Sequence, residues 1–113
     1  LPLGLTLGTT RDAPQEMHGE CGGHGGERVY RLAVGHEMAV CLDTFGSEID
    51  TVLYVHEGRC GAAADEILCN DDAEGLQSRL TLVADADTEY FVVVDSFGDG
   101  GDFTLEVTEG PCP

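Results

Sequence analysis

The chain has 113 residues, 42% of them hydrophobic, and carries 22 acidic against only 5 basic residues, for a formal net charge of −17. The length fits a single domain spanning residues 1–113, and the hydrophobic content excludes a disordered acidic tail. A charge of this sign repels the phosphates of nucleic acid and of anionic membranes, so neither is an expected partner. The natural counter-charges are Ca²⁺ ions or a basic protein surface.

Five cysteines without any CxxC pair predict disulfides in an oxidising compartment rather than a metal–thiolate site. No apolar run reaches the length of a transmembrane helix, so we expect no membrane insertion. The chain begins with LPLG and offers neither an initiator Met nor a basic leader, which predicts a mature chain or a piece of a longer protein. These features together predict a secreted, extracellular or cell-surface protein.

Apolar and polar residues alternate with a period of two along the chain, which predicts strands. In residues 102–107, for example, Phe103, Leu105 and Val107 alternate with polar residues. In chain order, the predicted strands are 3–10, 27–34, 36–43, 49–56, 66–69, 78–84, 89–95 and 102–107. No segment keeps a helical period over three turns, so we expect almost no helix.

Turn segments rich in glycine and aspartate separate these strands, as in GGHGG at 22–26, FGSE at 45–48 and GDGG at 98–101. Connections this short leave no room for crossover helices, so the strands should be antiparallel. The predicted fold class is all-β: a jelly-roll-like antiparallel β-sandwich of about eight strands, stapled by disulfides. We expect residues 1–10 to form an extended strand or arm and residues 109–113 a C-terminal tail.

Several motifs together resemble one bacterial family. They are DTVLYV, CNDD, SRLTL, YFVVVDSFG and GDFTLEV within residues 49–107, and a stretch from GTT to CGGHGGERVYRL extends the match back to about residue 8. In these motifs the chain resembles the pre-peptidase C-terminal (PPC) β-sandwich, in the cysteine-containing form of secreted myxobacterial proteins. The resemblance implies an eight-stranded sandwich without catalysis of its own, appended to secreted proteases and other exported proteins. Some members bind Ca²⁺, and others serve in adhesion or folding. This chain departs by its fifth cysteine, and these 113 residues include no enzyme domain beside the sandwich.

Four of the cysteines allow three connectivities. Spacing and the family resemblance together favour the bridges Cys21–Cys41 and Cys60–Cys69. Cys112 is then left over. Its alternatives are a partner cysteine beyond this stretch of sequence, an intermolecular bridge to a neighbouring subunit, or a reactive free thiol.

Three groups of oxygen-bearing side chains are candidates for a Ca²⁺ site built from separate loops. They are Asp43, Glu48 and Asp50; Asn70, Asp71 and Asp72; and Asp95, Asp99 and Asp102. Neither an EF-hand nor a tandem glycine-rich calcium repeat fits their spacing. Asp50, Asp71 and Asp72 are the strongest candidates, because the strand start at 50 and the loop at 70–72 would lie at one end of a sandwich. The alternative is that these acids are solvated turn residues, and the Asp99–Asp102 turn is expected to be a hairpin loop.

Other chemistry finds little support in the sequence. His18, Cys21 and His24 have a metal-ligand spacing for zinc or copper, but they lie in a glycine-rich loop and Cys21 is better used in a disulfide. His56 ends a strand and is expected at the surface. No catalytic motif is present, so we expect no enzyme. Tryptophan is absent, which disfavours a sugar-binding platform and leaves only Tyr54 and Phe97 as weak candidates.

These observations predict a non-catalytic accessory or adhesion module of an exported bacterial protein, stabilised by calcium. One alternative is a structural subunit of an extracellular filament or polymer, in which the N-terminal strand and Cys112 make contacts between copies. Another alternative is a carbohydrate- or protein-binding module of a secreted hydrolase. In each case the expected partners are other protein surfaces or copies of the chain itself.

Overall fold

The computed structural model describes residues 3–13, 22, 25–47, 49–58, 66–71, 77–96 and 100–112. These residues form strands and turns without a helix, and none of them belongs to a helix long and apolar enough to cross a membrane. The strands are β1 (Gly4–Thr9), β2 (Arg28–Leu32), β3 (Met38–Asp43), β4 (Thr51–Glu57), β5 (Glu66–Asn70), β6 (Arg79–Ala84), β7 (Tyr90–Ser96) and β8 (Asp102–Glu109). Each predicted strand is confirmed to within two residues at either end.

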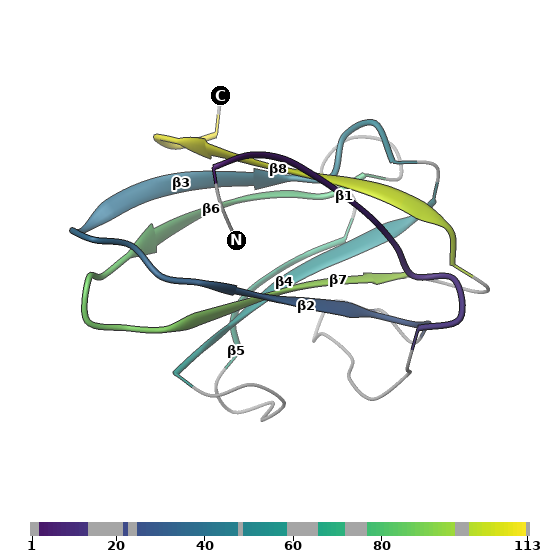
Figure 1. Cartoon of the computed structure of the whole chain (residues 1–113), viewed down its shortest axis with the longest axis horizontal. Helices are drawn as coiled ribbons and strands as arrows, with labels where there is room; N and C mark the ends of the chain where they lie inside the picture. Colours follow the sequence, from purple (N-terminus) through teal and green to yellow (C-terminus); the bar gives the residue numbers. More distant parts are fainter. Residues whose placement is uncertain are drawn as a thin grey trace.

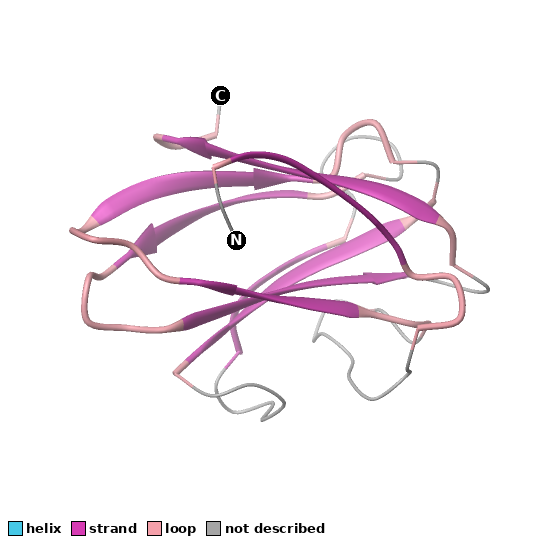
Figure 2. Cartoon of the chain, in the orientation of Figure 1, coloured by secondary structure: helices cyan, strands magenta, loops and turns pink. Residues whose placement is uncertain are grey.

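The strands form two four-stranded antiparallel sheets that stack as a sandwich (Figures 1 and 2). The first sheet has the order β1-β8-β3-β6 and the second the order β2-β7-β4-β5. The predicted antiparallel β-sandwich is therefore confirmed. Because β7 and β8 lie in different sheets, the expected hairpin at Asp99–Asp102 is wrong: this connection passes from one layer to the other.

The main core fills the space between the two sheets. Alternate residues of every inner strand enter it, including Leu42 of β3, Leu53 of β4, Val92 of β7 and Leu105 of β8, all fully buried. β4 and β7 are buried on their outer faces as well, where Val52 and other residues form a second, smaller apolar cluster. The second sheet is therefore covered on both faces along its two central strands.

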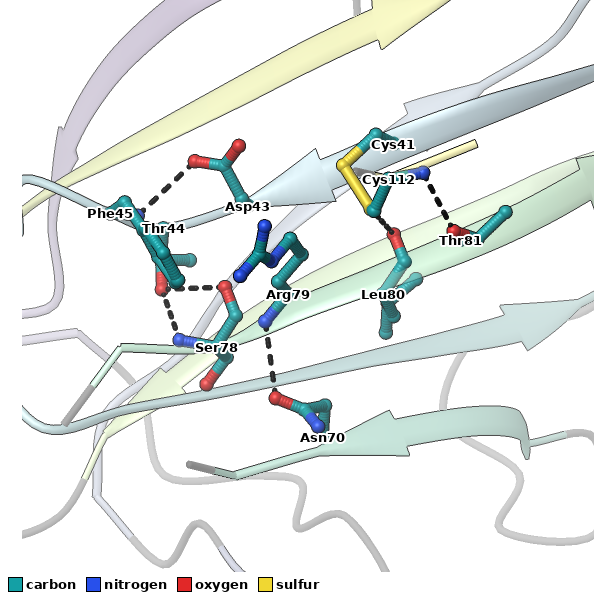
Figure 3. Close-up of a disulfide and its surroundings, with 10 residues drawn as sticks. All are labelled: Cys41, Asp43, Thr44, Phe45, Asn70, Ser78, Arg79, Leu80, Thr81 and Cys112. Atoms are coloured by element: carbon teal, nitrogen blue, oxygen red, sulfur yellow. Dashed lines mark hydrogen bonds between the residues drawn. A yellow bond between two sulfur atoms is a disulfide. The ribbon is translucent and has the colours of Figure 1, made fainter. Parts of the chain in front are cut away.

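The C-terminal tail crosses the outer face of the first sheet and is fixed there by a disulfide between Cys41 and Cys112 (Figure 3). β8 places Thr108 opposite Cys41 of β3. Gly110, with φ 98°, then turns the chain back across β3 in a conformation that glycine adopts easily. The backbone N–H of Cys112 donates to Thr81 Oγ1 of β6 at 3.0 Å. The tail thus links three neighbouring strands of the sheet.

Two cysteine predictions are consequently wrong: the Cys21–Cys41 bridge, and a Cys112 left over for another molecule. The reason is topological, because β8 lies beside β3 and brings the tail to Cys41 across a sequence separation of 71 residues. Cys69 is also disulfide-bonded. Cys21 and Cys60 lie outside the described residues, so the Cys60–Cys69 bridge stays a prediction.

Candidate functional site

One end of the second sheet gathers four acidic side chains with buried carboxylate oxygens. Glu27 and Asp50 stand one residue before β2 and β4, whereas Asp95 lies near the end of β7 and Asp71 directly follows β5. Because the neighbouring strands are antiparallel, these positions meet at the same end of the sheet. Glu27 Oε2, Asp50 Oδ1 and Asp71 Oδ1 are buried, and Asp95 is buried entirely. We call these four residues the acidic cluster.

Tyr54 connects the acidic cluster to the outer face of β4. Its hydroxyl donates to Asp95 Oδ2 at 2.8 Å, and Asp95 Oδ1 accepts the backbone N–H of Ser96 at 2.7 Å. Burial raises the pKa of Tyr54, and the negative charges of Asp95, Glu27 and Glu66 raise it further. The hydroxyl therefore stays protonated and acts as a fixed donor to a buried carboxylate.

His56 continues the polar part of this outer face. Its ring centroid lies 5.6 Å from that of Tyr54, and its Nε2 lies 3.8 Å from Glu66 Oε1. The side chains of His56 and Glu66 are only 2% and 3% exposed. Among the described residues neither ring nitrogen of His56 has a hydrogen-bond partner. The expectation of a surface histidine is wrong, because the outer face of β4 is itself buried.

Three buried hydroxyl groups hold two aspartate-bearing segments together. Thr44 Oγ1 and Thr51 Oγ1 lie 2.6 Å apart. Ser78 Oγ lies within hydrogen-bond distance of two carbonyl oxygens, 2.8 Å from Thr51 O and 2.5 Å from Asp71 O. Asp50 directly precedes Thr51. Ser78 therefore places the strand start at Asp50 beside Asp71, which confirms the prediction that these two segments lie at one end of the sandwich.

Other predicted calcium ligands have different surroundings. Asn70 Oδ1 accepts the backbone N–H of Arg79 at 3.1 Å and so joins β5 of the second sheet to β6 of the first (Figure 3). Asp43 Oδ1 accepts the backbone N–H of Phe45 at 3.2 Å in a local turn. Asp102 begins β8 in the first sheet and is exposed. None of these three side chains belongs to the acidic cluster.

Some predicted ligands cannot be placed. Glu48, Asp72 and Asp99 lie outside the described residues, as do His18 and His24 of the weaker zinc or copper pattern. In the part of the chain that the structure describes, no three His, Cys, Asp or Glu side chains are arranged to hold one metal ion. Ca²⁺ therefore stays a prediction, with Asp50 and Asp71 as its described candidate ligands.

Sequence reasoning missed Glu27 and the buried environment of the outer face. Glu27 was expected only as the first residue of the predicted strand 27–34. Tyr54 was considered for a sugar-binding surface, but it is fully buried, so that role is wrong, and Phe97 lies outside the described residues. One signal was present: residues 51–55 read TVLYV, and a strand without polar alternation is typical of burial on both faces.

Comparison with known proteins places the fold. No family model and no curated protein sequence matches the chain. Among solved structures it is similar to the pre-peptidase C-terminal domain of a collagenase from Bacillus anthracis, with a TM-score of 0.65 and 14% identity, covering 94% of this chain and 90% of that one. The chain has a PPC-like fold. At this identity the likeness concerns the fold, and the resemblance to the myxobacterial cysteine-containing form stays a prediction.

A second solved structure with this PPC-like fold has a different role. It is PliG of Aeromonas hydrophila, a periplasmic inhibitor of g-type lysozyme, with a TM-score of 0.57 and 16% identity, covering 94% of this chain and 82% of that one. The first similar structure is thus a domain of an enzyme, and the second is an inhibitor of one. The intramolecular Cys41–Cys112 disulfide of the present chain fits an oxidising compartment.

Proposed function

We propose that this chain is a non-catalytic accessory module of an exported protein, and that Ca²⁺ bound at Asp50 and Asp71, two members of the acidic cluster, stabilises it. The observation that carries the proposal is the burial of carboxylate oxygens from four acidic residues at one end of the second sheet, in a molecule of net charge −17. The PPC-like fold supports the accessory role. We place the module outside the cell or in the periplasm, in accordance with its disulfide.

The electrostatic argument favours a cation. Removing a carboxylate from water is costly unless it is paired, and neighbouring carboxylates add mutual repulsion. A divalent cation offsets both costs at once, and Ca²⁺ takes carboxylate, carbonyl and water oxygens in flexible geometry. Hydroxyl and amide donors already serve Asp95. Ser78 holds the segments that carry Asp50 and Asp71 together, and we propose these two residues as ligands, with the predicted Glu48 and Asp72.

Thermal unfolding with increasing CaCl₂ tests the calcium part of the proposal. A ligand that binds only the folded state raises the melting temperature with its concentration, and contributes about 2.7 kcal/mol when present at about one hundred times its Kd. We expect a progressive rise across millimolar Ca²⁺ that a chelator reverses. The variant carrying both Asp50→Asn and Asp71→Asn should lose this response.

Two controls separate site binding from charge screening. NaCl of matched ionic strength should raise the melting temperature less than CaCl₂ does. Asp87→Asn removes an exposed carboxylate from the turn between β6 and β7 and should leave the calcium response unchanged. Equal responses to CaCl₂ and to matched NaCl, or an undiminished calcium response in the Asp50/Asp71 variant, would count against the site.

The two features that favoured a filament subunit, Cys112 and the N-terminal strand, are both used within the chain. Cys112 is bonded to Cys41 within the same chain, and the N-terminal strand β1 pairs with β8 of its own sheet. A protein partner is the better candidate, and the periplasmic lysozyme inhibitor of similar fold supports this choice. We therefore propose that the module acts by contact with another protein.

A further inference from the structure

Strand β1 is an edge strand of the first sheet (Figure 1). It pairs with β8 on one side only, so part of its backbone N–H and C=O groups faces away from the sheet. Exposed edges are normally blocked by charged side chains, by proline or by a bulge. The strand reads GLTLGT, without charge or proline, and its pairing with β8 is regular over all six residues. Within the described residues β1 itself therefore carries no charge, proline or bulge that would prevent another strand from pairing with it, and only at its end does Thr9 O accept the Arg28 Nε–H at 2.8 Å.

A stripe of leucines lies along this edge. Leu3, Leu5 and Leu7 are 55%, 59% and 72% exposed. Because side chains alternate along a strand, Leu5 and Leu7 of β1 point to the same side, the outer face of the first sheet, and Leu3 directly precedes the strand. We call them the leucine stripe. Three neighbouring exposed leucines on one short segment form an apolar surface. A partner that covers this surface would remove it from water, which is favourable.

A groove of about 280 Å³ adjoins the stripe at Leu7. It is lined by Leu7, Gly8, Gly46, Asp102, Phe103 and Thr104. The Asp102 side chain is 60% exposed, and its only ion pair among the described residues is a 4.0 Å contact with the equally exposed Arg11. An apolar wall with one carboxylate suits a Lys or Arg side chain, whose methylene stem packs on apolar atoms while its charged end reaches an acid.

The charge around the stripe selects the partner. Glu106 lies opposite Leu5 on β8 and is exposed, as is Glu109 at the end of the same strand. A second copy of the chain would bring another net charge of −17 to this surface, which opposes self-association. A basic segment instead finds complementary charge beside the apolar stripe.

We propose that the leucine stripe and its groove dock an extended, basic segment of a partner protein. The segment adds a strand to β1, covers Leu5 and Leu7 with its own apolar side chains, and places a Lys or Arg side chain beside Asp102. The inference rests on the proposed accessory role of the module and names the surface and the chemistry of its partner.

Fluorescence anisotropy with a labelled synthetic peptide tests this docking. The probe alternates lysine with valine over a strand length of about nine residues, in a buffer of about 0.15 M salt. We expect it to bind at least about tenfold more tightly than a peptide of the same composition with its lysines in one block. The variant carrying Leu5→Thr and Leu7→Thr should weaken binding by about tenfold or more, and Asp102→Asn should weaken it less.

The matched control is Val83→Thr on β6. Val83 is 64% exposed on the opposite edge strand of the same sheet, so this variant should bind the alternating peptide as the unaltered chain does. A second peptide, N-methylated at alternate residues on its pairing edge, tests strand addition without altering the protein, and it should lose binding. Equal affinity for the alternating and block peptides would overturn the proposal, as would full affinity of the N-methylated peptide.

Sedimentation of the protein without peptide separates the two interpretations of the stripe. A monomer at all concentrations agrees with the proposal, whereas a dimer that Leu5→Thr and Leu7→Thr dissolve would overturn it in favour of a second copy. All measurements are repeated with CaCl₂ and with chelator. If the alternating peptide does not bind while Ca²⁺ still raises the melting temperature, the docking surface alone is refuted. If the peptide binds while Ca²⁺ does not change the melting temperature, only the calcium part of the proposed function is refuted.

Discussion

Tyr54 shows how strongly its surroundings define a residue in this protein. Tyrosine is an aromatic residue that is often found at protein surfaces, but Tyr54 lies fully buried on an outer strand face, and its hydroxyl donates a hydrogen bond to Asp95. Nearby, His56 has an equally buried ring facing Glu66. These side chains form a polar patch on the second sheet, and their properties follow from burial and from neighbouring carboxylates rather than from residue type.

Tyr54→Phe should therefore lower the free energy of unfolding by about 1–3 kcal/mol near neutral pH, because Oδ2 of a buried carboxylate loses its donor. The pKa of Tyr54 is raised in the folded state, so its contribution is fully present below the ordinary tyrosine pKa of about 10 and is lost as pH rises above it. Stability of the unaltered chain should fall above that pH by up to about 1.4 kcal/mol per pH unit from this group. Urea unfolding at several pH values checks this, and an identical alkaline slope in Tyr54→Phe would contradict it.

Gly8 lies where β1 packs tightly against the side chains of Phe103 and Tyr30. A Cβ at Gly8 would lie 2.6 Å from Phe103 Cζ and 2.8 Å from the Tyr30 hydroxyl. Phe103 is almost fully buried and has little room to move. Gly8→Ala should therefore cost about 1–3 kcal/mol of unfolding free energy. Gly35→Ala is the matched control, because nothing lies within 4 Å of its added Cβ, and it should change stability by no more than about 0.5 kcal/mol. Equal denaturant midpoints for the two variants would refute the close approach of β1 to the core.

At the level of elements, the C-terminal tail binds β8, β3 and β6 into one unit. Gly110 N donates to Ala39 O of β3 at 2.8 Å, and Cys112 then reaches both Cys41 and Thr81. The tail therefore acts as a cross-strand staple on the outer face of the first sheet. The opposite edge of that sheet, β1, has no such staple among the described residues and leaves its leucines in solvent.

Replacing both Cys41 and Cys112 with alanine should lower the free energy of unfolding by about 2–4 kcal/mol. A bridge that spans 71 residues removes considerable freedom from the unfolded chain, which is the larger part of its effect in the chain-entropy model. Denaturant unfolding measures the loss. Peptide mapping under non-reducing conditions should recover Cys41 and Cys112 in one fragment, and a fragment joining Cys41 to Cys21 would contradict this connectivity.

At the level of the whole molecule, the fold holds a net charge of −17 within a radius of gyration of 12.6 Å. The Debye length at 0.1 M salt is about 10 Å, so salt screens repulsion between carboxylates on opposite sides of the domain. The described Arg–carboxylate pairs are exposed, at 4.0 Å for Arg11–Asp102 and 3.3 Å for Arg31–Glu89, and such pairs contribute little. Repulsion between like charges is therefore the dominant long-range term.

The melting temperature should accordingly rise with NaCl from about 0.01 M to about 0.5 M. Differential scanning calorimetry in the presence of chelator isolates this effect from any bound divalent ion. A melting temperature that falls with NaCl would show that attractive ion pairs outweigh the repulsion.

The positions of the strands and their antiparallel arrangement in a sandwich were predicted from the sequence, because a period of two and short turns are local properties of the chain. The placement of the strand start at Asp50 and of Asp71 at one end of the sandwich was also predicted, since both positions border strands that a sandwich would bring together. The Cys41–Cys112 bridge, the burial of His56 and the membership of Glu27 in the acidic cluster were decided only by the tertiary structure. Each depends on which strands become neighbours and on what covers an outer face, and these contacts join residues far apart in the chain, where local periodicity carries no information.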